Sequence, residues 1–519
     1  MKENIYLTGF MGAGKSTVGR ELAGRLNREF VDMDEVLAKE MGMPVREVFE
    51  RLGEKAFRER EAALLERLSG QKRLVVATGG GAVERSRNRK LMHDSGLIIH
   101  LETELPACMA RLRTEEAEAR PLWRDPESLQ ALFERRKKLY QDCEFSLRVD
   151  GRGPQEIVEM ISGRLWPEKT FKVRLGEQEC PVFCTLDAPA VLAGLTEGRR
   201  VALLTDRNVA RHHGHRYSRA LNASLTMELP PGEKTKTLHQ ARRLYQALLE
   251  NKFDRGDLLA AVGGGMITDL GAFVAATFKR GMDFVLAATS LLGCVDAAIG
   301  GKAGVNLGPA KNAVGCFTVP AGVILDVKAL TTLRRQHISD GLIEAYKTGL
   351  AASAELAGLI EQDRQSLLAR DLLALAGVVE LSSRAKAEVV GRDFREQGWR
   401  GILNLGHTYG HAVEGWHKYK ISHGQAVAMG LMAAAELSRR RGLISEDLGQ
   451  RIISTVHKLK PKPVVRPPLD QAWEIMKHDK KIRQGRMIFV LLEGPGQPVL
   501  VDDVSQTELA AALDNISWG

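Results

Sequence analysis

Hydrophobic and polar positions along the first 165 residues alternate between two patterns. Short apolar runs of strand length cover residues 5–8, 74–78 and 97–101, and an amphipathic helical pattern begins at Lys15. Strands that alternate with helices along a chain predict a parallel α/β sheet. A turn-rich segment at residues 150–154 precedes one more helical pattern, which stops at Trp166 and Pro167. We therefore expect a first domain over residues 1–166.

A second α/β pattern starts near residue 171. Its strand-like runs include residues 201–205 and 258–262, and the later run ends in three consecutive glycines. From residue 327 onward Ala, Leu and Glu dominate with helical periodicity. The pattern predicts an α/β domain over residues 171–326 and a mostly α-helical domain over residues 327–519. A chain of 519 residues is also longer than one hydrophobic core usually supports.

The charge distribution favours small anionic ligands over nucleic acid. The chain has 74 basic and 65 acidic residues, a formal charge of +9, and its basic residues are scattered rather than gathered in an arm. Nucleic-acid binding would require a basic stripe with stacking aromatics, whereas an anionic small molecule needs only a few Arg and Lys in a cleft. We expect small anionic substrates and no nucleic-acid partner.

Cysteine content and apolar runs bear on the compartment. Six cysteines in so long a chain do not form the dense framework of a small secreted domain. The glycine loop that starts at residue 9 leaves no room for a signal peptide before it, and no uncharged apolar run reaches membrane-spanning length. We expect a cytoplasmic protein without a membrane partner.

Residues 9–17 form a phosphate-binding loop of the Walker A type, Gly-Phe-Met-Gly-Ala-Gly-Lys-Ser-Thr, between a strand and a helix. Its glycines let backbone N–H groups wrap phosphates at the helix N-terminus, where the helix dipole adds positive potential. Lys15 would bridge the outer phosphates, and the Ser16 hydroxyl would face Mg²⁺. The expected ATP contacts are Gly12, Ala13, Gly14, Lys15, Ser16 and Thr17.

Two acids, Asp32 and Asp34, follow the next strand-like segment with one residue between them. In a kinase such a pair can divide its work, one carboxylate near Mg²⁺ and the other on the acceptor hydroxyl as base or orienting group. The alternative is an acidic helix cap, which is a common use of Asp. The residues alone leave both interpretations open.

Further motifs extend the pattern of the first domain: Phe57-Arg58, Gly79-Gly80-Gly81, Arg120-Pro121-Leu122, and Arg136 four residues before Tyr140. With the phosphate loop, they make residues 1 to about 165 resemble shikimate kinase. The resemblance implies that Mg-ATP is the cofactor, with Mg²⁺ near Ser16 and Asp32, and that Lys15, Asp34 and Arg120 are catalytic. It also implies that Arg120 lies on a mobile lid that closes over ATP. Shikimate would be held by Asp34, Arg58, Gly80, Gly81 and Arg136.

In the second region, two signals are weak by themselves. Gly263-Gly264-Gly265 with Asp269 follows a strand, but Thr268 occupies the last glycine position of the dinucleotide fingerprint, so a tight strand-to-helix turn is an equal alternative. His407 and His411 stand at i and i+4, which places two imidazoles on one helix face as a candidate ligand pair. The stretch lacks the glutamate of a zinc-protease motif, and isolated histidines at this spacing are more often structural than metal-binding.

The whole constellation from residue 171 to the end resembles 3-dehydroquinate synthase. The matching runs are Pro231-Gly232-Glu233 with Lys236, Gly263 to Asp269, Arg280-Gly281, Asp296 through Lys302, Lys311-Asn312, Glu344 through Lys347, Arg400 with Asn404, His407 to His411, His423-Gly424 and Asp479-Lys480-Lys481. The resemblance implies a Rossmann-like NAD-binding domain followed by a helical metal- and substrate-binding domain. It assigns a divalent metal, Zn²⁺ or Co²⁺, to Glu344, His407 and His423, and it moves His411 to the substrate site as a candidate proton carrier.

The same resemblance implies the remaining site residues of the second half. The catalytic set is Lys302, Lys347, Lys386, Glu396, Arg400, Asn404 and His411. The NAD contacts are Asp206, Asn208, Glu233, Lys236, Gly264, Gly265, Asp269, Thr289, Ser290, Asp296, Lys302, Lys311 and Asn312. The implied substrate is 3-deoxy-D-arabino-heptulosonate 7-phosphate, and NAD is regenerated in each turnover. A homodimer through the synthase half is also implied.

The resemblance predicts a bifunctional enzyme whose two reactions both belong to chorismate and aromatic amino acid biosynthesis, at non-adjacent steps. One alternative keeps the fold and changes the second reaction to another sugar phosphate cyclase or a metal-dependent polyol dehydrogenase. Another is that one half is a degenerate binding module.

Ala288-Thr289-Ser290 stands where the family usually has Pro-Thr-Thr, which predicts an altered affinity for NAD. We expect His212, His213 and His215 to lie in a solvated basic turn.

Overall fold

The computed structural model describes residues 4–114, 126–166, 168–308, 310–477, 482–483 and 486–516. The chain divides into two compact units, Met1–Pro167 and Glu168–Gly519, so the break lies at the Pro167 position where the last helical pattern of the first domain stops. The predicted division at residue 326 falls at the end of a strand inside the second unit.

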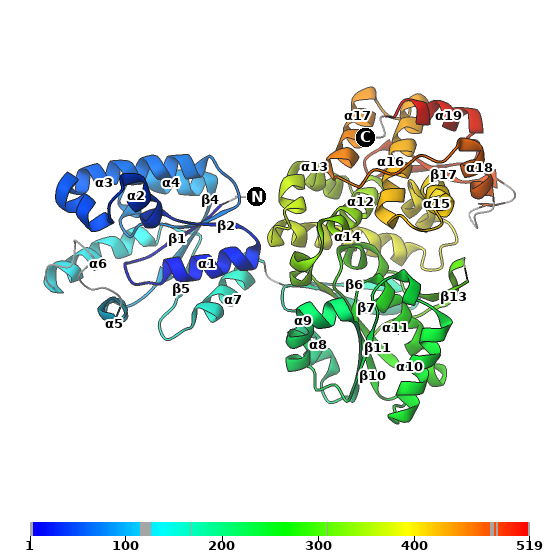
Figure 1. Ribbon diagram of the computed structural model, residues 1–519, viewed down its shortest axis with the longest axis horizontal. Helices are drawn as coiled ribbons and strands as arrows, with labels where there is room; N and C mark the ends of the chain where they lie inside the picture. The colour runs from blue at the N-terminus through cyan, green and yellow to red at the C-terminus, as the bar shows by residue number, and fades with distance from the viewer. Residues whose placement is uncertain are drawn as a thin grey trace. The chain divides into compact units, whose positions relative to one another are not determined.

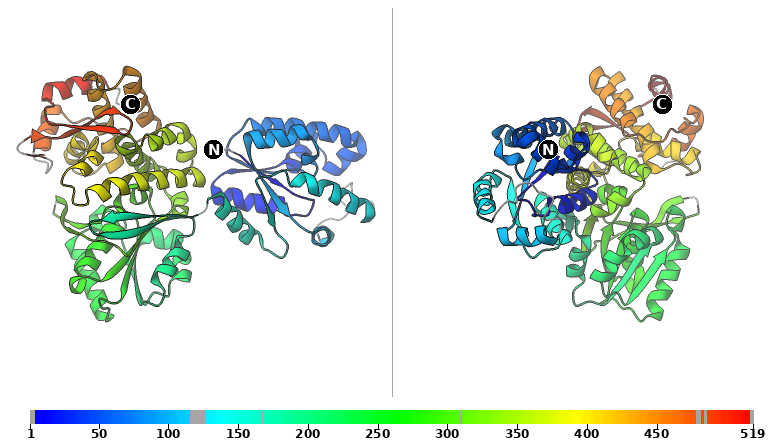
Figure 2. Two further views of the ribbon diagram at one scale, coloured as in Figure 1. Left: turned by 180° about the vertical axis from the view of Figure 1, so that it is seen from behind. Right: turned by 60° about the vertical axis from the view of Figure 1, so that its left-hand side comes forward.

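The first unit is a parallel five-stranded sheet with the order β2-β3-β1-β4-β5. Its strands are β1 (Asn4–Thr8), β2 (Glu29–Asp32), β3 (Leu74–Ala77), β4 (Gly96–Glu102) and β5 (Phe145–Arg148). Its helices are α1 (Lys15–Leu26), α2 (Met33–Met41), α3 (Val45–Ser69), α4 (Ser86–Ser95), α5 (Leu105–Thr114), α6 (Pro126–Tyr140) and α7 (Pro154–Leu165). Helices α1 and α7 cover one face of the sheet, and α3 and α4 cover the other (Figure 1 and, from behind, Figure 2). Because both faces are covered, β1 and β3 are buried at every position, which explains their continuous apolar runs.

The second unit contains a seven-stranded sheet with the order β6-β7-β14-β11-β10-β8-β9. Its strands are β6 (Lys169–Leu175), β7 (Gln178–Thr185), β8 (Val201–Asp206), β9 (Leu225–Leu229), β10 (Leu258–Gly263), β11 (Asp283–Ala288) and β14 (Gly322–Asp326). Only the edge strand β6 pairs antiparallel among these strands. Helices α8 (Ala188–Thr196) and α9 (Arg207–Ala220) cover one face, and α10 (Leu238–Glu250) and α11 (Gly265–Thr277) cover the other (Figure 1). A hairpin of β12 (Lys302–Leu307) and β13 (Ala310–Phe317) packs against α11.

The rest of the second unit is mostly helical, as the periodicity predicts. It comprises α12 (Arg335–Ala352), α13 (Ala354–Leu368), α14 (Leu372–Arg392), α15 (His407–Trp416), α16 (His423–Arg440), α17 (Glu446–Lys458), α18 (Leu469–Lys477) and α19 (Gln506–Asp514). Two small hairpins, β15 (Ile482–Arg483) with β16 (Arg486–Met487) and β17 (Phe489–Gly494) with β18 (Gln497–Val501), complete it. Helix α14 packs on β6 and joins the helical layer to the sheet. No helix in the described part of the chain is both long and apolar enough to cross a bilayer.

The expectation for the histidines near residue 213 was wrong in two respects. They lie on helix α9 rather than in a turn, and the His213 side chain is buried, whereas His212 and His215 are exposed as expected. Its Nε2 lies 2.8 Å from the Thr332 hydroxyl, in the 3₁₀ turn that follows β14. The helix turns His213 toward the protein while its basic neighbours keep the local sequence polar, so the local sequence does not reveal the burial.

Candidate active sites

The phosphate loop of the first unit occupies the turn between β1 and α1. Gly12 and Gly14 have φ angles of +79° and +84°, which residues with a Cβ rarely adopt. The Lys15 ammonium folds back over the loop and donates to the carbonyl oxygens of Gly9 and Phe10 at 2.9 and 3.0 Å. The loop and its lysine are therefore already arranged around the space that phosphates would occupy.

Asp32 caps helix α2, one of the two alternatives that the sequence left open, and it also contacts Ser16 of the phosphate loop. Its Oδ2 accepts a hydrogen bond from the Ser16 hydroxyl at 2.5 Å, while its Oδ1 accepts from the backbone N–H groups of Asp34 and Glu35 and caps α2. A hydroxyl next to a carboxylate at the end of the phosphate loop is a donor set that suits Mg²⁺. The residues present therefore fit a magnesium ion beside the loop.

The residues predicted for shikimate converge on the glycines after β3. A Cβ on Gly81 would lie 2.2 Å from the Arg58 Nη2 atom, and one on Gly80 would lie 3.5 Å from Arg136 Nη1. A Cβ on Gly79 would lie 3.1 Å from an Asp34 carboxylate oxygen. The structure thus brings Asp34, Arg58 and Arg136 around one glycine turn, from three separate helices. Arg120 lies outside the described residues.

Two acids that the sequence analysis missed hold these arginines. Glu61 is fully buried and accepts from Arg58 Nη1 with both carboxylate oxygens, at 3.1 and 3.0 Å. Burial raises the pKa of Glu61 despite the neighbouring Arg58 charge. Glu84 accepts from Arg136 Nε at 2.7 Å, and the buried Nη2 of Arg136 has no hydrogen-bond partner among the described residues. The Nη2 donor of Arg136 is therefore available to bind a carboxylate, while its Nε is held by Glu84.

In the second unit, several predicted NAD contacts gather where parallel strands end. Asp206 ends β8 and caps α9, Gly264 precedes α11 after β10, and Thr289 and Ser290 follow β11. A Cβ on Gly264 would lie 3.2 Å from Ser290 Oγ, so a side chain at this position would press on Ser290. The carboxyl ends of neighbouring strands β8, β10 and β11 form one edge of the sheet, which is where dinucleotides bind in folds of this type.

Lys236 connects this edge to the β12–β13 hairpin. Its buried ammonium lies 2.5 Å from Asp269 Oδ2 on α11 and 2.5 Å from Asn312 Oδ1 on β13. Glu233, one turn earlier, accepts from Asn306 of the same hairpin at 2.9 Å. Burial raises the pKa of Asp269, although the Lys236 charge opposes the rise. Predicted NAD contacts that lie far apart in the sequence are therefore hydrogen-bonded to one another or to the same hairpin.

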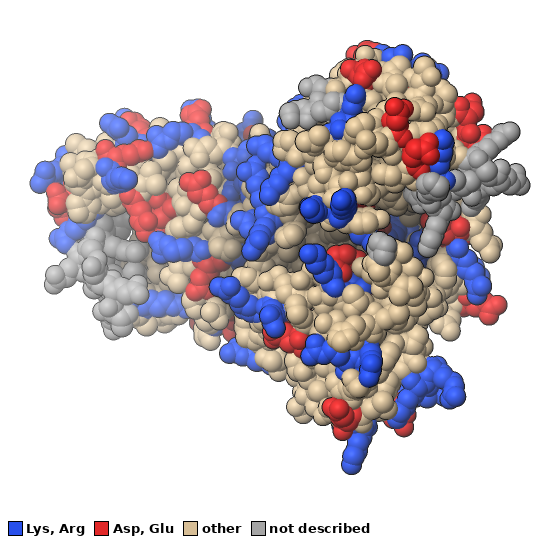
Figure 3. All heavy atoms as spheres, turned by 45° about the vertical axis from the view of Figure 1, so that its right-hand side comes forward, with Lys and Arg blue, Asp and Glu red and all other residues tan. Residues whose placement is uncertain are grey.

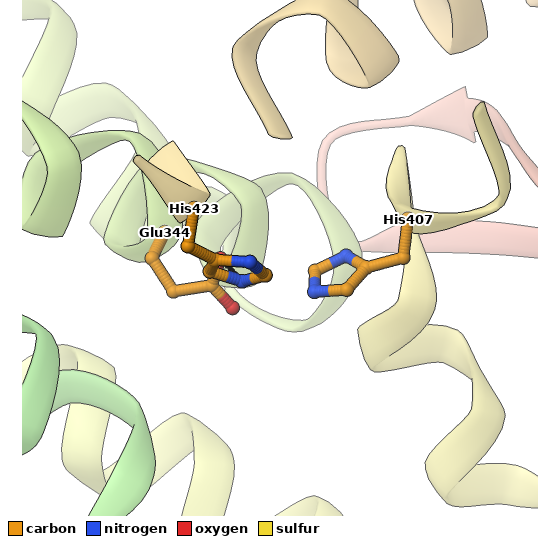
Figure 4. A group of neighbouring side chains, drawn as sticks. All are labelled: Glu344, His407 and His423. Atoms are coloured by element: carbon orange, nitrogen blue, oxygen red, sulfur yellow. Dashed lines mark ion pairs between the residues drawn. The ribbon is translucent and has the colours of Figure 1, made fainter. Parts of the chain in front are cut away.

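Three side chains from three helices point toward one another in a candidate metal centre: Glu344 on α12, His407 on α15 and His423 on α16 (Figure 4). Their ligand atoms all lie within 4.8 Å of one another, and no other such group occurs in the part of the chain that the structure describes. The Lys347 ammonium donates a hydrogen bond to Glu344 Oε1. The buried Glu344 Oε2 has no hydrogen-bond partner in the part of the chain that the structure describes. One carboxylate and two imidazoles around an unsatisfied oxygen fit a catalytic divalent metal.

His411 lies beside this set but does not belong to it. Its ring centroid is 5.1 Å from that of His407 and 6.3 Å from that of His423. His407 and His423 come within 5.2 Å although 16 residues separate them, because α15 and α16 pack together. The spacing argument that paired His407 with His411 therefore named the wrong second histidine, and the resemblance named the one that the geometry selects.

A cavity of about 700 Å³ opens in front of Glu344, His407 and His423. All seven residues assigned to synthase catalysis line it: Lys302, Lys347, Lys386, Glu396, Arg400, Asn404 and His411. The NAD candidates Asp269, Asp296, Lys302, Lys311 and Asn312 also line it. Figure 3 shows basic and acidic side chains side by side around a hollow in this face. The structure therefore joins the metal and substrate candidates with five of the thirteen predicted NAD contacts in one cavity, and the other eight do not line it.

The lysines of the cavity are paired with acids, and its arginine is held by backbone carbonyl groups. Lys386 contacts Asp296, Lys302 contacts Glu396, and Lys311 contacts Glu414 at 2.6 Å. Arg400 donates to the Gly300 and Phe394 carbonyl oxygens at 3.2 and 2.7 Å. Burial lowers the pKa of Lys386, and Asp296 opposes this effect. Paired cations hold fixed positions, so an anionic ligand meets a preorganised set of donors.

Glu414 was not predicted, although its carboxylate lies between Lys311 and His423. Its signal in the sequence was its place on α15, seven residues after His407 and so on nearly the same helix face. Glu61 carried a comparable signal, three residues after Arg58. Glu84 carried none, because its partner Arg136 is 52 residues away. Lys480 lies outside the described residues.

Comparisons with known proteins agree with both halves of this picture. Residues 11–165 match the shikimate kinase family, residues 226–340 the N-terminal 3-dehydroquinate synthase family, and residues 341–482 its C-terminal counterpart. The 3-dehydroquinate synthase of Pseudomonas entomophila is 40% identical over 66% of this chain and 97% of its own. The solved 2-epi-5-epi-valiolone synthase of Streptomyces hygroscopicus, with NAD⁺ and Zn²⁺ bound, is 27% identical with a TM-score of 0.61, covering 65% of this chain and 97% of that one.

One relative spans both units. The bifunctional shikimate kinase/3-dehydroquinate synthase of Thermotoga maritima is 33% identical over 491 residues, which is 93% of this chain and 94% of the relative. A match of that length extends over both units and the junction between them. The chain therefore belongs to the family of bifunctional shikimate kinase/3-dehydroquinate synthases, and it is an enzyme with a kinase unit and a synthase unit.

Proposed function

We propose that the first unit transfers the γ-phosphoryl group of Mg-ATP to the 3-hydroxyl of shikimate. The Walker loop and the Lys15 ammonium bind the phosphates, and the Ser16–Asp32 pair orients the magnesium ion. Asp34, beside Gly79, accepts the proton of the acceptor hydroxyl. Arg58 and Arg136 bind the carboxylate of shikimate, which a guanidinium fork recognises well. The convergence of these three side chains on one glycine turn carries the proposal.

We propose that the second unit converts 3-deoxy-D-arabino-heptulosonate 7-phosphate to 3-dehydroquinate and phosphate. The observation that carries the proposal is the set Glu344, His407 and His423 at the wall of a cavity lined by paired lysines and Arg400. When bound, NAD accepts and returns a hydride, and a divalent metal ion such as Zn²⁺ or Co²⁺ polarises the oxygens it contacts. The relative that carries NAD⁺ and Zn²⁺ in its solved structure supports both cofactors.

The chain's own residues account for substrate binding and proton movement. Lys302, Lys386 and Arg400 are held by neighbouring acids and carbonyls, and they bind the carboxylate and phosphate of the substrate. His411 lines the cavity beside His407, where its imidazole carries a proton between substrate and solvent. The walls formed by α11, α12 and α15 reduce contact of the reacting atoms with bulk water.

The first experiment measures phosphate release from the heptulosonate phosphate with catalytic NAD⁺, with and without a chelator, while absorbance records any NADH. We expect chelator-sensitive phosphate release without net NADH. Steady NADH accumulation would instead support a polyol dehydrogenase. Turnover of another sugar phosphate in preference to this one would support a different cyclase, a reaction class to which the 27% identical relative belongs.

A second assay addresses the kinase unit by shikimate-dependent formation of ADP. Lys15→Met should remove this activity and leave phosphate release by the synthase unit unchanged, because the two units have separate cores and sites. ADP formation that does not depend on shikimate would contradict the assigned acceptor.

A further inference from the structure

The two metal-candidate histidines are oriented by different partners. His407 Nδ1 lies 3.2 Å from the carbonyl oxygen of Leu405, two residues earlier, which directs its Nε2 toward the centre. His423 presents Nε2 to Glu344, 3.7 Å from Oε2, and presents Nδ1 to Glu414, 3.6 Å from its Oε2. His407 thus depends on a local backbone group, whereas His423 depends on a side chain from another helix.

Glu414 is placed to serve two groups at once. Its side chain is buried on α15, its Oε1 accepts from Lys311 Nζ at 2.6 Å, and its Oε2 faces His423. Lys311 also lies 4.4 Å from the centroid of the Tyr419 ring, so the ammonium is held from two sides. One carboxylate therefore connects the metal-candidate helix α16 with the β12–β13 hairpin.

We propose that Glu414 is a positioning residue that holds His423 with Nε2 directed at the metal and anchors Lys311 at the wall of the cavity. The inference rests on the proposed function of the synthase unit, because it assumes that the Glu344, His407 and His423 set binds a divalent ion. A carboxylate behind a ligating histidine fixes its tautomer and ring orientation and increases its basicity as a ligand. Glu414 touches neither substrate nor NAD in this role, and it acts through His423 and Lys311.

The test is the affinity of the full-length protein for Zn²⁺, measured by competition with a chromophoric chelator, so that no turnover is needed. Glu414→Gln keeps the shape of the side chain and removes its charge. We expect its Zn²⁺ affinity to fall by about 10- to 100-fold, the range for partners behind metal ligands. The visible absorption spectrum of the Co²⁺-loaded protein should also change, since His423 then adopts a different orientation. A merely structural role would leave that spectrum unchanged.

Two variants separate this effect from general damage. Glu436→Gln alters an equally buried acid on the same helix as His423, where Arg439 and Asn515 are its partners, and it should keep wild-type affinity and spectrum. Lys311→Met removes the partner of Glu414 Oε1 and leaves the contact with His423, so it should also retain Zn²⁺ affinity.

Wild-type affinity and spectrum in Glu414→Gln would overturn the positioning role while leaving the proposed function intact. Equal losses in Glu414→Gln and Glu436→Gln would also overturn it, because they would report general loosening of the helices. A wild-type protein that binds no Zn²⁺ would overturn the inference together with the proposed synthase function.

Discussion

The hydroxyl of Ser16 and the carboxylate of Asp32 meet at 2.5 Å at the base of the phosphate loop. Ser16 lies in the first turn of α1, and Asp32 ends β2, a strand two places away from β1 in the sheet. The same carboxylate caps α2 with its other oxygen. Asp32 therefore connects the loop, the strand end and the helix that carries Asp34.

Asp32→Asn should separate these two roles. Asparagine caps helices about as well as aspartate, so the thermal unfolding of the kinase unit should change little. Loss of the negative charge should weaken Mg²⁺ binding and lower the kinase rate by about 100-fold or more, since a metal contributes several kcal/mol to transition-state stabilisation. Kinase rates measured over a Mg²⁺ titration check this. Wild-type Mg²⁺ dependence would contradict a role for Asp32 near the ion.

Gly81→Ala should disturb Arg58 without disturbing the backbone. The φ angle of Gly81 is −100°, which alanine adopts readily, but the new Cβ would lie 2.2 Å from Arg58 Nη2. Displacing a guanidinium that binds a carboxylate should raise the KM for shikimate by about 10-fold or more. Steady-state kinetics at saturating ATP measure the change.

Gly70→Ala is the matched control for this substitution. A Cβ there would lie 3.6 Å from the Arg67 carbonyl oxygen, which is ordinary contact. We expect its KM for shikimate to equal that of the wild type. An unchanged KM in Gly81→Ala would mean that Arg58 does not bind the substrate in the position seen here.

The free energy of unfolding of the synthase unit should fall as the pH drops below the pKa of an ordinary histidine. Burial lowers the pKa of His213 to about 4, and Arg216 adds to this effect while Asp326 opposes it. The folded state disfavours the protonated ring, so stability is fully present above the unfolded pKa, near 6.5, and is lost as the pH falls toward 4. The loss by about pH 5 should be on the order of 2 kcal/mol.

Urea unfolding at about pH 7.5 and about pH 5 measures this loss. His213→Gln cannot titrate, so its stability should depend less on pH than that of the wild type over the same range. His100 in the kinase unit also has a pKa lowered to about 4 by burial, and the comparison with the variant removes its contribution. Equal pH dependence in both proteins would show that His213 does not titrate as its burial predicts.

Removing the metal should affect the units unequally. The chelator 1,10-phenanthroline binds Zn²⁺ and Co²⁺ and leaves Mg²⁺ in solution, so synthase activity should be lost while kinase activity remains. A ligand present at about 100 times its Kd stabilises the folded state by about 2.7 kcal/mol, and its removal should lower the unfolding temperature of the synthase unit by several degrees. Calorimetry with and without the chelator measures the shift. Equal shifts in both units would contradict a site confined to Glu344, His407 and His423.

The amino-acid sequence by itself determined the local features of this protein. The phosphate loop is contiguous, so its glycines, Lys15 and Ser16 identify it without any distant contact. Buried parallel strands leave continuous apolar runs, and this is why the strands near residues 5, 74, 201 and 258 could be predicted. The metal candidates could be named only through the resemblance, because spacing favoured His411.

The tertiary structure alone decided which residues face one another. Lys236 meets Asn312 across 76 positions, Lys386 meets Asp296 across 90, and Lys311 meets Glu414 across 103. His213 is buried although its neighbours on α9 are basic. Periodicity records which face of an element is turned inward, whereas the packing of helices and strands far apart in the chain determines what that face contacts. The pairing of each cation in the cavity, and the place of Glu414 behind His423, follow from that packing.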